Sequence, residues 1–196
     1  MSKSVPLVMT AALIALSGCG SQEGAKKDGN TANAVEAVKE AGKTTIAAGL
    51  NQDSRFLQLA RAAGIDATLS GPGPYTVFVA DDAAFGKLPA GTVDNWLKAE
   101  SKPELTSVLR YNILPGTVLA ADIGKAIDNG KGKAQLATVG GEPLTATREG
   151  GNIVLTDAAG TKATVTKADE TRANGVVHEV NAVLQPGRKG AQSREQ

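Results

Sequence analysis

Apolar residues recur at helical spacing in several segments before residue 115. The first predicted helix follows Asp53 or Ser54, either of which can cap it, and ends at Gly64. A second helix is expected around residues 92–99, and a third begins at Pro103, because proline suits the first helical position. The apolar positions that carry this pattern are Phe56, Leu57, Leu59, Ala60, Ala63, Trp96, Leu97, Leu105, Val108 and Leu109.

One strand is predicted between the first two of these helices. Residues 75–80 are β-branched, aromatic or small, as in a buried strand. The Gly-Pro-Gly-Pro run at 71–74 forces a turn before it. After the strand, Asp81 and Asp82 can cap a short helix that carries Phe85. Asp82 could instead face a ligand, although a cap explains it with fewer assumptions.

From residue 133 onward the pattern changes to short alternating strands. The predicted strands cover residues 135–139, 144–148, 153–156, 162–166 and 175–184. Glycine-containing pairs at 140–141, 150–151 and 159–160 are typical of hairpin turns between them. Helices followed by hairpins predict an α+β fold with an antiparallel sheet.

Polar segments flank this pattern. Residues 19–43 are rich in Gly, Ala, Lys, Glu, Asn and Thr and cannot bury enough surface to offset chain entropy, which predicts a flexible tether. Residues 187–196 are expected to form a disordered tail. The folded domain is therefore expected over residues 44–186.

The N-terminus has the pattern of an export signal. Lys3 precedes an apolar run from Val5 to Leu16 that is shorter than the ~20 residues of a membrane-spanning helix. The following Leu-Ser-Gly-Cys at 16–19 resembles the lipobox of bacterial lipoproteins. That resemblance implies a signal peptide over residues 1–18 and a lipid on Cys19, which would attach the chain to a membrane. The alternative is a secreted protein with an incidental cysteine.

The same resemblance bears on localisation. Position 20 is Gly rather than Asp, which in a Gram-negative lipoprotein implies the outer membrane, facing the periplasm or the surface. In a Gram-positive host the anchor would lie on the outer face of the only membrane. The bacterial cell envelope is expected in either case.

Composition excludes several classes of function. Lys and Arg total 21 against 20 Asp and Glu, so the chain lacks the basic surface expected for nucleic-acid binding. One Cys and one His cannot form a disulfide framework or an ordinary zinc site. Aromatic residues make up only 3%, too few for extensive stacking on bases or sugars. No metal and no cofactor is expected.

Four residues are candidates for an interaction surface: Tyr111, Asn112, Asp169 and His178. His178 could titrate or bind a metal, but it lies in a valine-rich strand where a hydrogen-bonded structural histidine is favoured. Tyr111 could line a surface, or it could be structural with its hydroxyl bonded. Asp169 and Glu170 could be paired carboxylates for acid–base chemistry, but adjacent residues point to opposite faces of a strand and are usually solvated in a loop. No Gly-x-Ser-x-Gly motif occurs. The chain is therefore not expected to be an enzyme, and it has no expected catalytic residue.

Three spaced segments together resemble the fasciclin-like domain family. YTVFVADDAAF at 75–85 is similar to the first family signature, and NGVVHEV at 174–180, continuing to Pro186, is similar to the second. Between them, LRYNILPG at 109–116 resembles the Tyr-His segment of the family. The resemblance covers residues 44–186 and implies a twisted wedge of about seven strands with helices packed at one side.

What the family resemblance implies is a non-catalytic adhesion or interaction module at the cell envelope, with an unknown protein or polysaccharide partner. The alternative is a carrier of a small apolar ligand, such as a lipid or pigment. Three departures from the family pattern are visible: Asn112 replaces the histidine, Ala80-Asp81 replaces Pro-Thr, and Glu170 follows Asp169 where animal relatives have isoleucine. The last departure means that integrin-type adhesion is not supported.

Overall fold

The computed structural model describes residues 42–187. The predicted signal peptide, Cys19, nearly all of the predicted tether and the tail from residue 188 lie outside the described residues. In chain order the elements are α2 (Ile46–Gly49), α3 (Arg55–Ala63), α4 (Asp66–Ser70), β1 (Tyr75–Ala80), α5 (Asp82–Phe85), α6 (Thr92–Trp96), the 3-10 helix η1 (Ala99–Ser101), α7 (Lys102–Tyr111), β2 (Ile113–Pro115), α8 (Ala120–Asn129), β3 (Lys133–Leu136), β4 (Leu144–Glu149), β5 (Asn152–Thr156), β6 (Lys162–Arg172) and β7 (Gly175–Val180).

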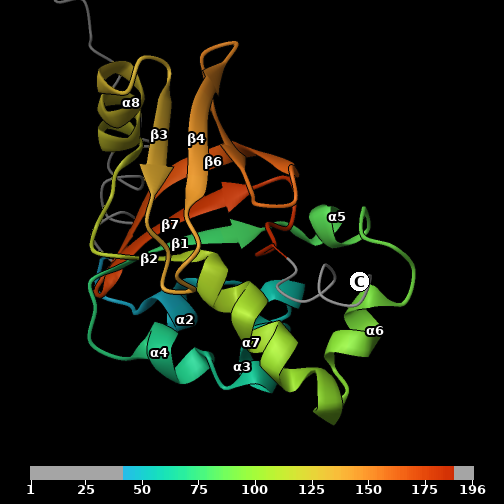
Figure 1. Ribbon diagram of the computed structural model, residues 1–196. Helices are drawn as coiled ribbons and strands as arrows, with labels where there is room; N and C mark the ends of the chain where they lie inside the picture. The colour runs from blue at the N-terminus through green and yellow to red at the C-terminus, as the bar shows by residue number, and fades with distance from the viewer. Residues whose placement is uncertain (1–41, 188–196) are drawn as a thin grey trace, which may run out of the picture.

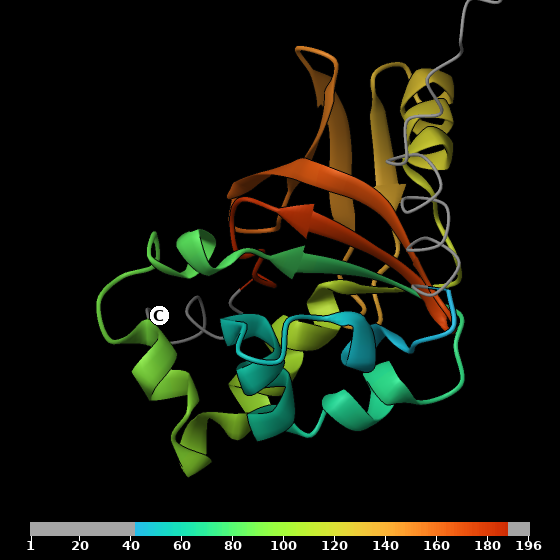
Figure 2. The same ribbon diagram turned by 180° about the vertical axis from the view of Figure 1, so that it is seen from behind.

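One sheet of seven strands organises the domain, in the order β2-β1-β7-β6-β5-β4-β3. Helices α2, α3, α4, α6 and α7 lie on one side of β1 and β7, whereas α8 stands apart beside β3 (Figures 1 and 2). The predicted α+β class with about seven strands is confirmed.

The expectation of a wholly antiparallel sheet is wrong at one place. β1 and β7 run parallel over their full lengths, from Tyr75↔Gly175 to Ala80↔Val180. Every other pair of neighbouring strands is antiparallel. Hairpin turns impose antiparallel pairing on adjacent strands, but β1 and β7 are joined through most of the domain, and a long crossover permits parallel pairing.

The two edge strands of the sheet approach each other, whereas the neighbouring strands β5 and β6 are paired over only part of their length. The Val139 N–H, just after β3, donates to the Ile113 carbonyl of β2 over 2.7 Å, so the two edge strands are linked. Pairing between β5 and β6 stops at Val154↔Thr164, although β6 continues to Arg172. Beyond that point β6 pairs only with β7, through two register shifts.

Local sequence signals set the helix ends. The Ser54 hydroxyl accepts from the Leu57 N–H and Gly64 adopts a left-handed φ of 76°, as predicted for α3. The Asp81 carboxylate caps α5 by accepting from the Ala84 N–H over 2.6 Å. Asp82 is also a cap, but of a different helix, because it accepts from the Arg55 N–H at the start of α3 over 2.9 Å.

Several element bounds differ from those predicted. The helix expected over 92–99 ends at Trp96, and the strand expected over 135–139 lies at Lys133–Leu136. The last strand, expected over 175–184, ends at Val180, and the Leu184 carbonyl beyond it accepts from Asn112 at the end of α7. Within residues 42–187 no helix has both the length and the apolar character needed to cross a membrane.

Candidate functional site

The four candidate residues lie in two separate places. Tyr111 and Asn112 end helix α7, whereas Asp169 lies in β6 and His178 in β7. Tyr111, Asn112 and His178 are 0%, 3% and 0% exposed, so they do not form the interaction surface suggested for them. Only the side chain of Asp169 is substantially exposed, at 42%. The reason is that the polar atoms of the buried three bond to backbone groups of other segments.

Tyr111 joins α7 to two loops of the sheet. Its hydroxyl donates to the Pro143 carbonyl over 3.1 Å and accepts from the Ala158 N–H over 3.2 Å. Burial raises the pKa of the Tyr111 hydroxyl above its ordinary value of 10.0, and the Asp157 and Glu142 carboxylates raise it further. Tyr111 is therefore a neutral structural residue.

Asn112, where the family has histidine, holds the C-terminal segment against α7. Its Nδ2 donates to the Val108 carbonyl over 2.8 Å and to the Leu184 carbonyl over 2.9 Å. An uncharged amide can make both bonds at any pH, which a histidine cannot. Asn112 thus forms a buried contact between the end of α7 and the C-terminal segment.

His178 is fully buried between β1, β6 and the connection from β2 to α8. Its Nδ1 accepts from the Asp169 N–H over 3.2 Å, so the proton of the neutral ring lies on Nε2, which donates to the Val118 carbonyl over 2.9 Å. The ring stacks on Phe78 with centroids 5.5 Å apart. Burial lowers the pKa of His178 below its ordinary 6.5, while the bond to Val118 and the Asp169 charge oppose that shift.

The stability of the domain is expected to depend on pH through His178. Its lowered pKa means that the unfolded chain binds a proton more readily than the folded one. The free energy of unfolding should therefore be constant above about pH 6.5 and fall as the pH drops toward the lowered folded pKa, by at most about 1.4 kcal/mol per pH unit. Urea unfolding from pH 8 to pH 5 measures this. His178→Gln should reduce the slope between pH 6.5 and 5; an unchanged slope would assign it to other groups.

Asn174 is a site residue that sequence reasoning missed. Its Oδ1 accepts from the Ile46 N–H over 2.7 Å, and its Nδ2 donates to the Leu69 and Gly71 carbonyls over 2.9 and 2.8 Å. One side chain thus joins α2 and the end of α4 to the start of β7. The available signal was the Asn-Gly pair that begins the second family signature, which gave no hint of its distant partners.

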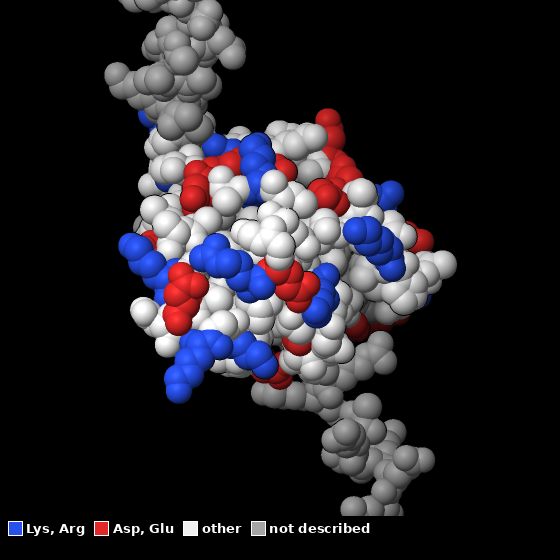
Figure 3. Space-filling model, turned by 90° about the horizontal axis from the view of Figure 1, so that it is seen from above, with Lys and Arg blue, Asp and Glu red and all other residues white. Residues whose placement is uncertain are grey.

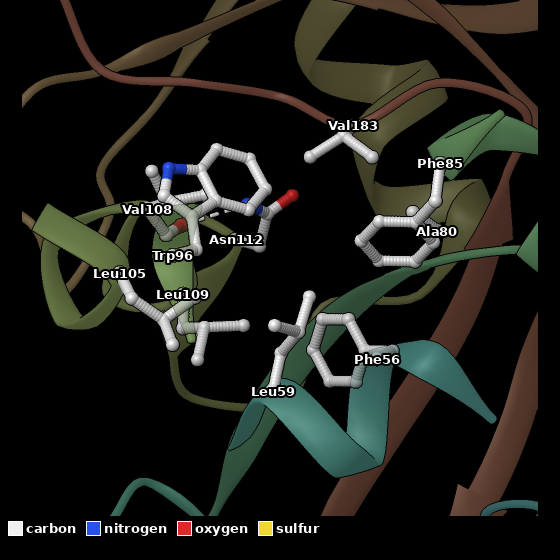
Figure 4. Close-up of a pocket in the computed structure, with 10 residues that line it drawn as sticks. All are labelled: Phe56, Leu59, Ala80, Phe85, Trp96, Leu105, Val108, Leu109, Asn112 and Val183. Carbon is white, nitrogen blue, oxygen red and sulfur yellow. Dashed lines mark hydrogen bonds between the residues drawn. The ribbon is translucent and has the colours of Figure 1, made fainter. Parts of the chain in front are cut away.

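A small apolar cavity lies among α3, α5, α6, α7 and the C-terminal segment (Figure 4). Rings of Phe56, Phe85 and Trp96 face it, and Asn112 is its only polar lining residue. Its volume of about 10 Å³ is close to the space that one water molecule occupies. In this conformation the cavity does not accommodate an organic ligand.

In the described part of the chain, Asp169 and Glu170 are used in a helix cap and in ion pairs. Asp169 caps a helix, whereas Glu170 pairs with Arg172 over 2.9 Å and with Lys167. Within residues 42–187, no three His, Cys, Asp or Glu side chains are grouped as metal ligands. On the face seen from above, basic and acidic side chains are intermixed (Figure 3).

The chain is similar in sequence to a known domain family and to several known proteins. The family model of the fasciclin domain matches residues 51–186. Protein sll1483 of Synechocystis sp. is 35% identical over 141 residues, which cover 72% of this chain and 71% of that protein. Transforming growth factor-beta-induced protein ig-h3 of Sus scrofa is 32% identical over 148 residues, covering 74% of this chain and 20% of that protein.

Two further matches cover smaller shares of this chain. Immunogenic protein MPB70 of Mycobacterium bovis is 34% identical over 114 residues, covering 58% of this chain and 51% of that protein. The solved structure of a domain pair from the insect cell adhesion molecule fasciclin I has a TM-score of 0.49 and 22% identity, and covers 66% of this chain and 44% of that one. The chain therefore spans about a fifth of the porcine relative and about half of the mycobacterial one.

Proposed function

Because the chain belongs to the fasciclin domain family, we propose that it is a non-catalytic adhesion or protein–matrix interaction module attached to the bacterial cell envelope. The observation that carries this proposal is the family match over residues 51–186, which includes all seven strands. The use of the Tyr111, Asn112 and His178 polar groups in internal hydrogen bonds supports the non-catalytic part.

The proposed attachment is a lipid on Cys19. Each buried CH₂ group adds about 0.8 kcal/mol of membrane affinity, so two or three acyl chains would hold the protein durably. Cleavage before Cys19 would remove Lys3 and leave 20 basic and 20 acidic residues. A formally neutral chain would recognise its partner through shape and hydrogen bonding more than through long-range attraction.

Replacing Cys19 by alanine is expected to release the protein from membranes. The wild type should incorporate radiolabelled palmitate and sediment with the membrane fraction, because the thiol is the proposed acylation site. Cys19→Ala should do neither. Ser17→Ala is the matched control, since it keeps a small residue before the cut and should retain label and sedimentation. Equal sedimentation of unlabelled Cys19→Ala and wild type would contradict a lipid anchor.

The interaction role is tested in cells. A deletion strain should aggregate less and bind less surface matrix than one complemented with the wild-type chain, and Cys19→Ala should restore neither property if attachment is required. A pull-down with the purified domain over residues 42–187 should recover a protein or polysaccharide from matrix extracts of the same strain. Identical aggregation and binding by deletion and wild-type strains would overturn the adhesion proposal.

The carrier alternative is favoured by one observation, the apolar lining of the cavity at Phe56, Phe85 and Trp96. An apolar ligand would enter only if the lining residues moved apart, because the cavity volume is about 10 Å³. Native mass spectrometry of protein purified from its own host distinguishes the two functions. A stoichiometric apolar passenger would support the carrier, whereas a mass equal to that of the lipidated chain alone would support the interaction module.

A further inference from the structure

We propose that His178 and Asp169 form a proton-operated switch that controls the start of helix α8. The proposal goes beyond the interaction function and does not depend on it. It rests on one carboxylate oxygen that lies between two possible donors: the Ala120 N–H at 2.8 Å and Nδ1 of His178 at 3.9 Å.

Several hydrogen bonds hold the connection between β2 and α8, and one of them runs from the Gly116 N–H to the Pro74 carbonyl over 2.9 Å. The Thr76 hydroxyl donates to the Gly116 carbonyl and accepts from the Val118 N–H, each over 2.8 Å. Nε2 of His178 bonds to the Val118 carbonyl over 2.9 Å, and Oδ1 of Asp169 accepts from the Ala120 N–H. Of these bonds, the two nearest to α8 are thus the ones that involve His178 and Asp169.

Helix α8 has no local cap and depends on Asp169. The residue at its N-cap position is Leu119, whose side chain cannot accept a hydrogen bond. The first N–H groups of a helix lack internal partners and attract negative charge. Asp169 supplies a carboxylate from a position 49 residues later in the chain.

The backbone of Asp169 allows it to serve both groups. It adopts a φ of 61°, which is uncommon for a residue other than glycine, within the second register shift of β6. In this conformation the Asp169 N–H meets the His178 ring while its carboxylate meets the start of α8. Both contacts therefore depend on the same irregularity of the strand.

Protonation of His178 changes what the ring requires. Nδ1 becomes a donor, so the Asp169 N–H loses its acceptor and faces another N–H. The new Nδ1–H needs an acceptor, and Oδ1 of Asp169 is a carboxylate oxygen only 3.9 Å away. Moving about 1 Å closer would give a charge-assisted hydrogen bond. The same movement draws the oxygen away from the Ala120 N–H and releases the first turn of α8.

Among residues 42–187, the other elements around the ring present no charge to it. Phe78 of β1 presents an apolar ring, and the connection to α8 presents the Val118 carbonyl. On β6 and β7, Lys167 lies 3.8 Å from Glu179 and also pairs with Glu170. Asp169 is the charged group that acts on the His178 ring.

Release of α8 would widen a cleft that is already present. Ala120 and Ala121, at the start of α8, face Ile153 of β5 and Val165 of β6 across a space of about 340 Å³, where β5 and β6 separate. Outward movement of the first turn would expose Ile153 and Val165. Acidification would thereby uncover an apolar surface that is largely hidden at neutral pH.

Amide hydrogen exchange of residues 42–187 tests the switch. Between pH 7.5 and pH 5.0, after correction for intrinsic exchange rates, the wild-type amides of residues 120–123 should lose about fivefold more protection than those of α7, as expected for loss of a helix cap. Asp169→Asn keeps an acceptor for the Ala120 N–H and tolerates the positive φ, but it cannot pair ionically with His178. In this variant the amides of residues 120–123 should lose no more protection than those of α7.

His178→Gln is the second variant. Its amide can donate to the Val118 carbonyl and accept from the Asp169 N–H without titrating, so the preferential loss should disappear. The proposal is overturned if, in the wild type, the amides of residues 120–123 lose no more protection than those of α7 between pH 7.5 and pH 5.0. It is also overturned if Asp169→Asn shows the same preferential loss as the wild type. Asp169→Asn alters an exposed side chain, so this comparison stands even if the buried His178→Gln variant fails to fold.

Discussion

Replacing Asn174 by alanine is expected to destabilise the domain by about 3 kcal/mol or more. The substitution removes three hydrogen bonds at a site that is 8% exposed and leaves the buried Ile46 N–H and the Leu69 carbonyl without this partner. Each buried polar group left unpaired costs about 1–3 kcal/mol. Because Asn174 joins α2 and α4 to β7, the loss should appear as a lower urea midpoint of the single unfolding transition.

Two control variants make the Asn174 measurement specific. Asn152→Ala removes the same side chain from an exposed position at the start of β5 and should change stability by less than about 0.5 kcal/mol. Asn174→Asp keeps the acceptor for Ile46 but turns a buried carboxylate oxygen toward the Leu69 and Gly71 carbonyls, so at neutral pH it should be no more stable than Asn174→Ala. If Asn174→Ala were as stable as Asn152→Ala, the bonds from Asn174 would contribute little to folding.

Gly175→Ala is expected to be at least as damaging, with a loss of about 3 kcal/mol or more. A Cβ atom on Gly175 would lie 1.9 Å from the Tyr75 carbonyl oxygen and 2.8 Å from its carbon. These are backbone atoms of the neighbouring strand, so β1 and β7 would have to separate at their first paired position. The positive φ of 153° adds backbone strain for alanine. Urea unfolding of the purified domain gives the free-energy difference.

The matched control for the crowding at Gly175 is Gly160→Ala. Gly160 also has a positive φ, 88°, but a Cβ atom there would meet nothing within 4 Å. Its expected cost is the backbone strain alone, about 1 kcal/mol. Equal costs for the two substitutions would mean that β1 and β7 adapt easily and that close packing at Gly175 is unimportant.

Elements with local signals were predicted well from the sequence. Strand β1 matches its predicted bounds because its apolar run lies between a proline-rich turn and an aspartate cap. Helix α8 was not predicted, because its only large apolar residues are Ile123 and Ile127, and its cap comes from a distant strand. Strand β2 was also missed, since three residues directly after a helix carry no alternating pattern.

In the candidate site, too, individual residues could be recognised from the sequence, whereas their contacts with distant segments could not. Tyr111, Asn112 and His178 were recognised as unusual residues, and the structural alternatives for Tyr111 and His178 are confirmed. Their assignment to a surface was wrong because their side chains are buried and bond to backbone carbonyl and N–H groups, most of them in other segments of the chain. The contact from Asn112 to Leu184 crosses 72 residues, and such a contact leaves no periodicity in the sequence.

The parallel pairing of β1 with β7 has a consequence for how the protein is made. Each residue of β1 pairs with the residue one hundred positions later, so the centre of the sheet cannot assemble until nearly all of the domain is available. Long-range pairing of this kind slows folding, because a large loop must close first. A chain delivered N-terminus first would present the apolar strand at Tyr75–Ala80 without its neighbour, as an edge open to aggregation. During synthesis β1 therefore lacks its partner on this side until β7 has been added to the chain.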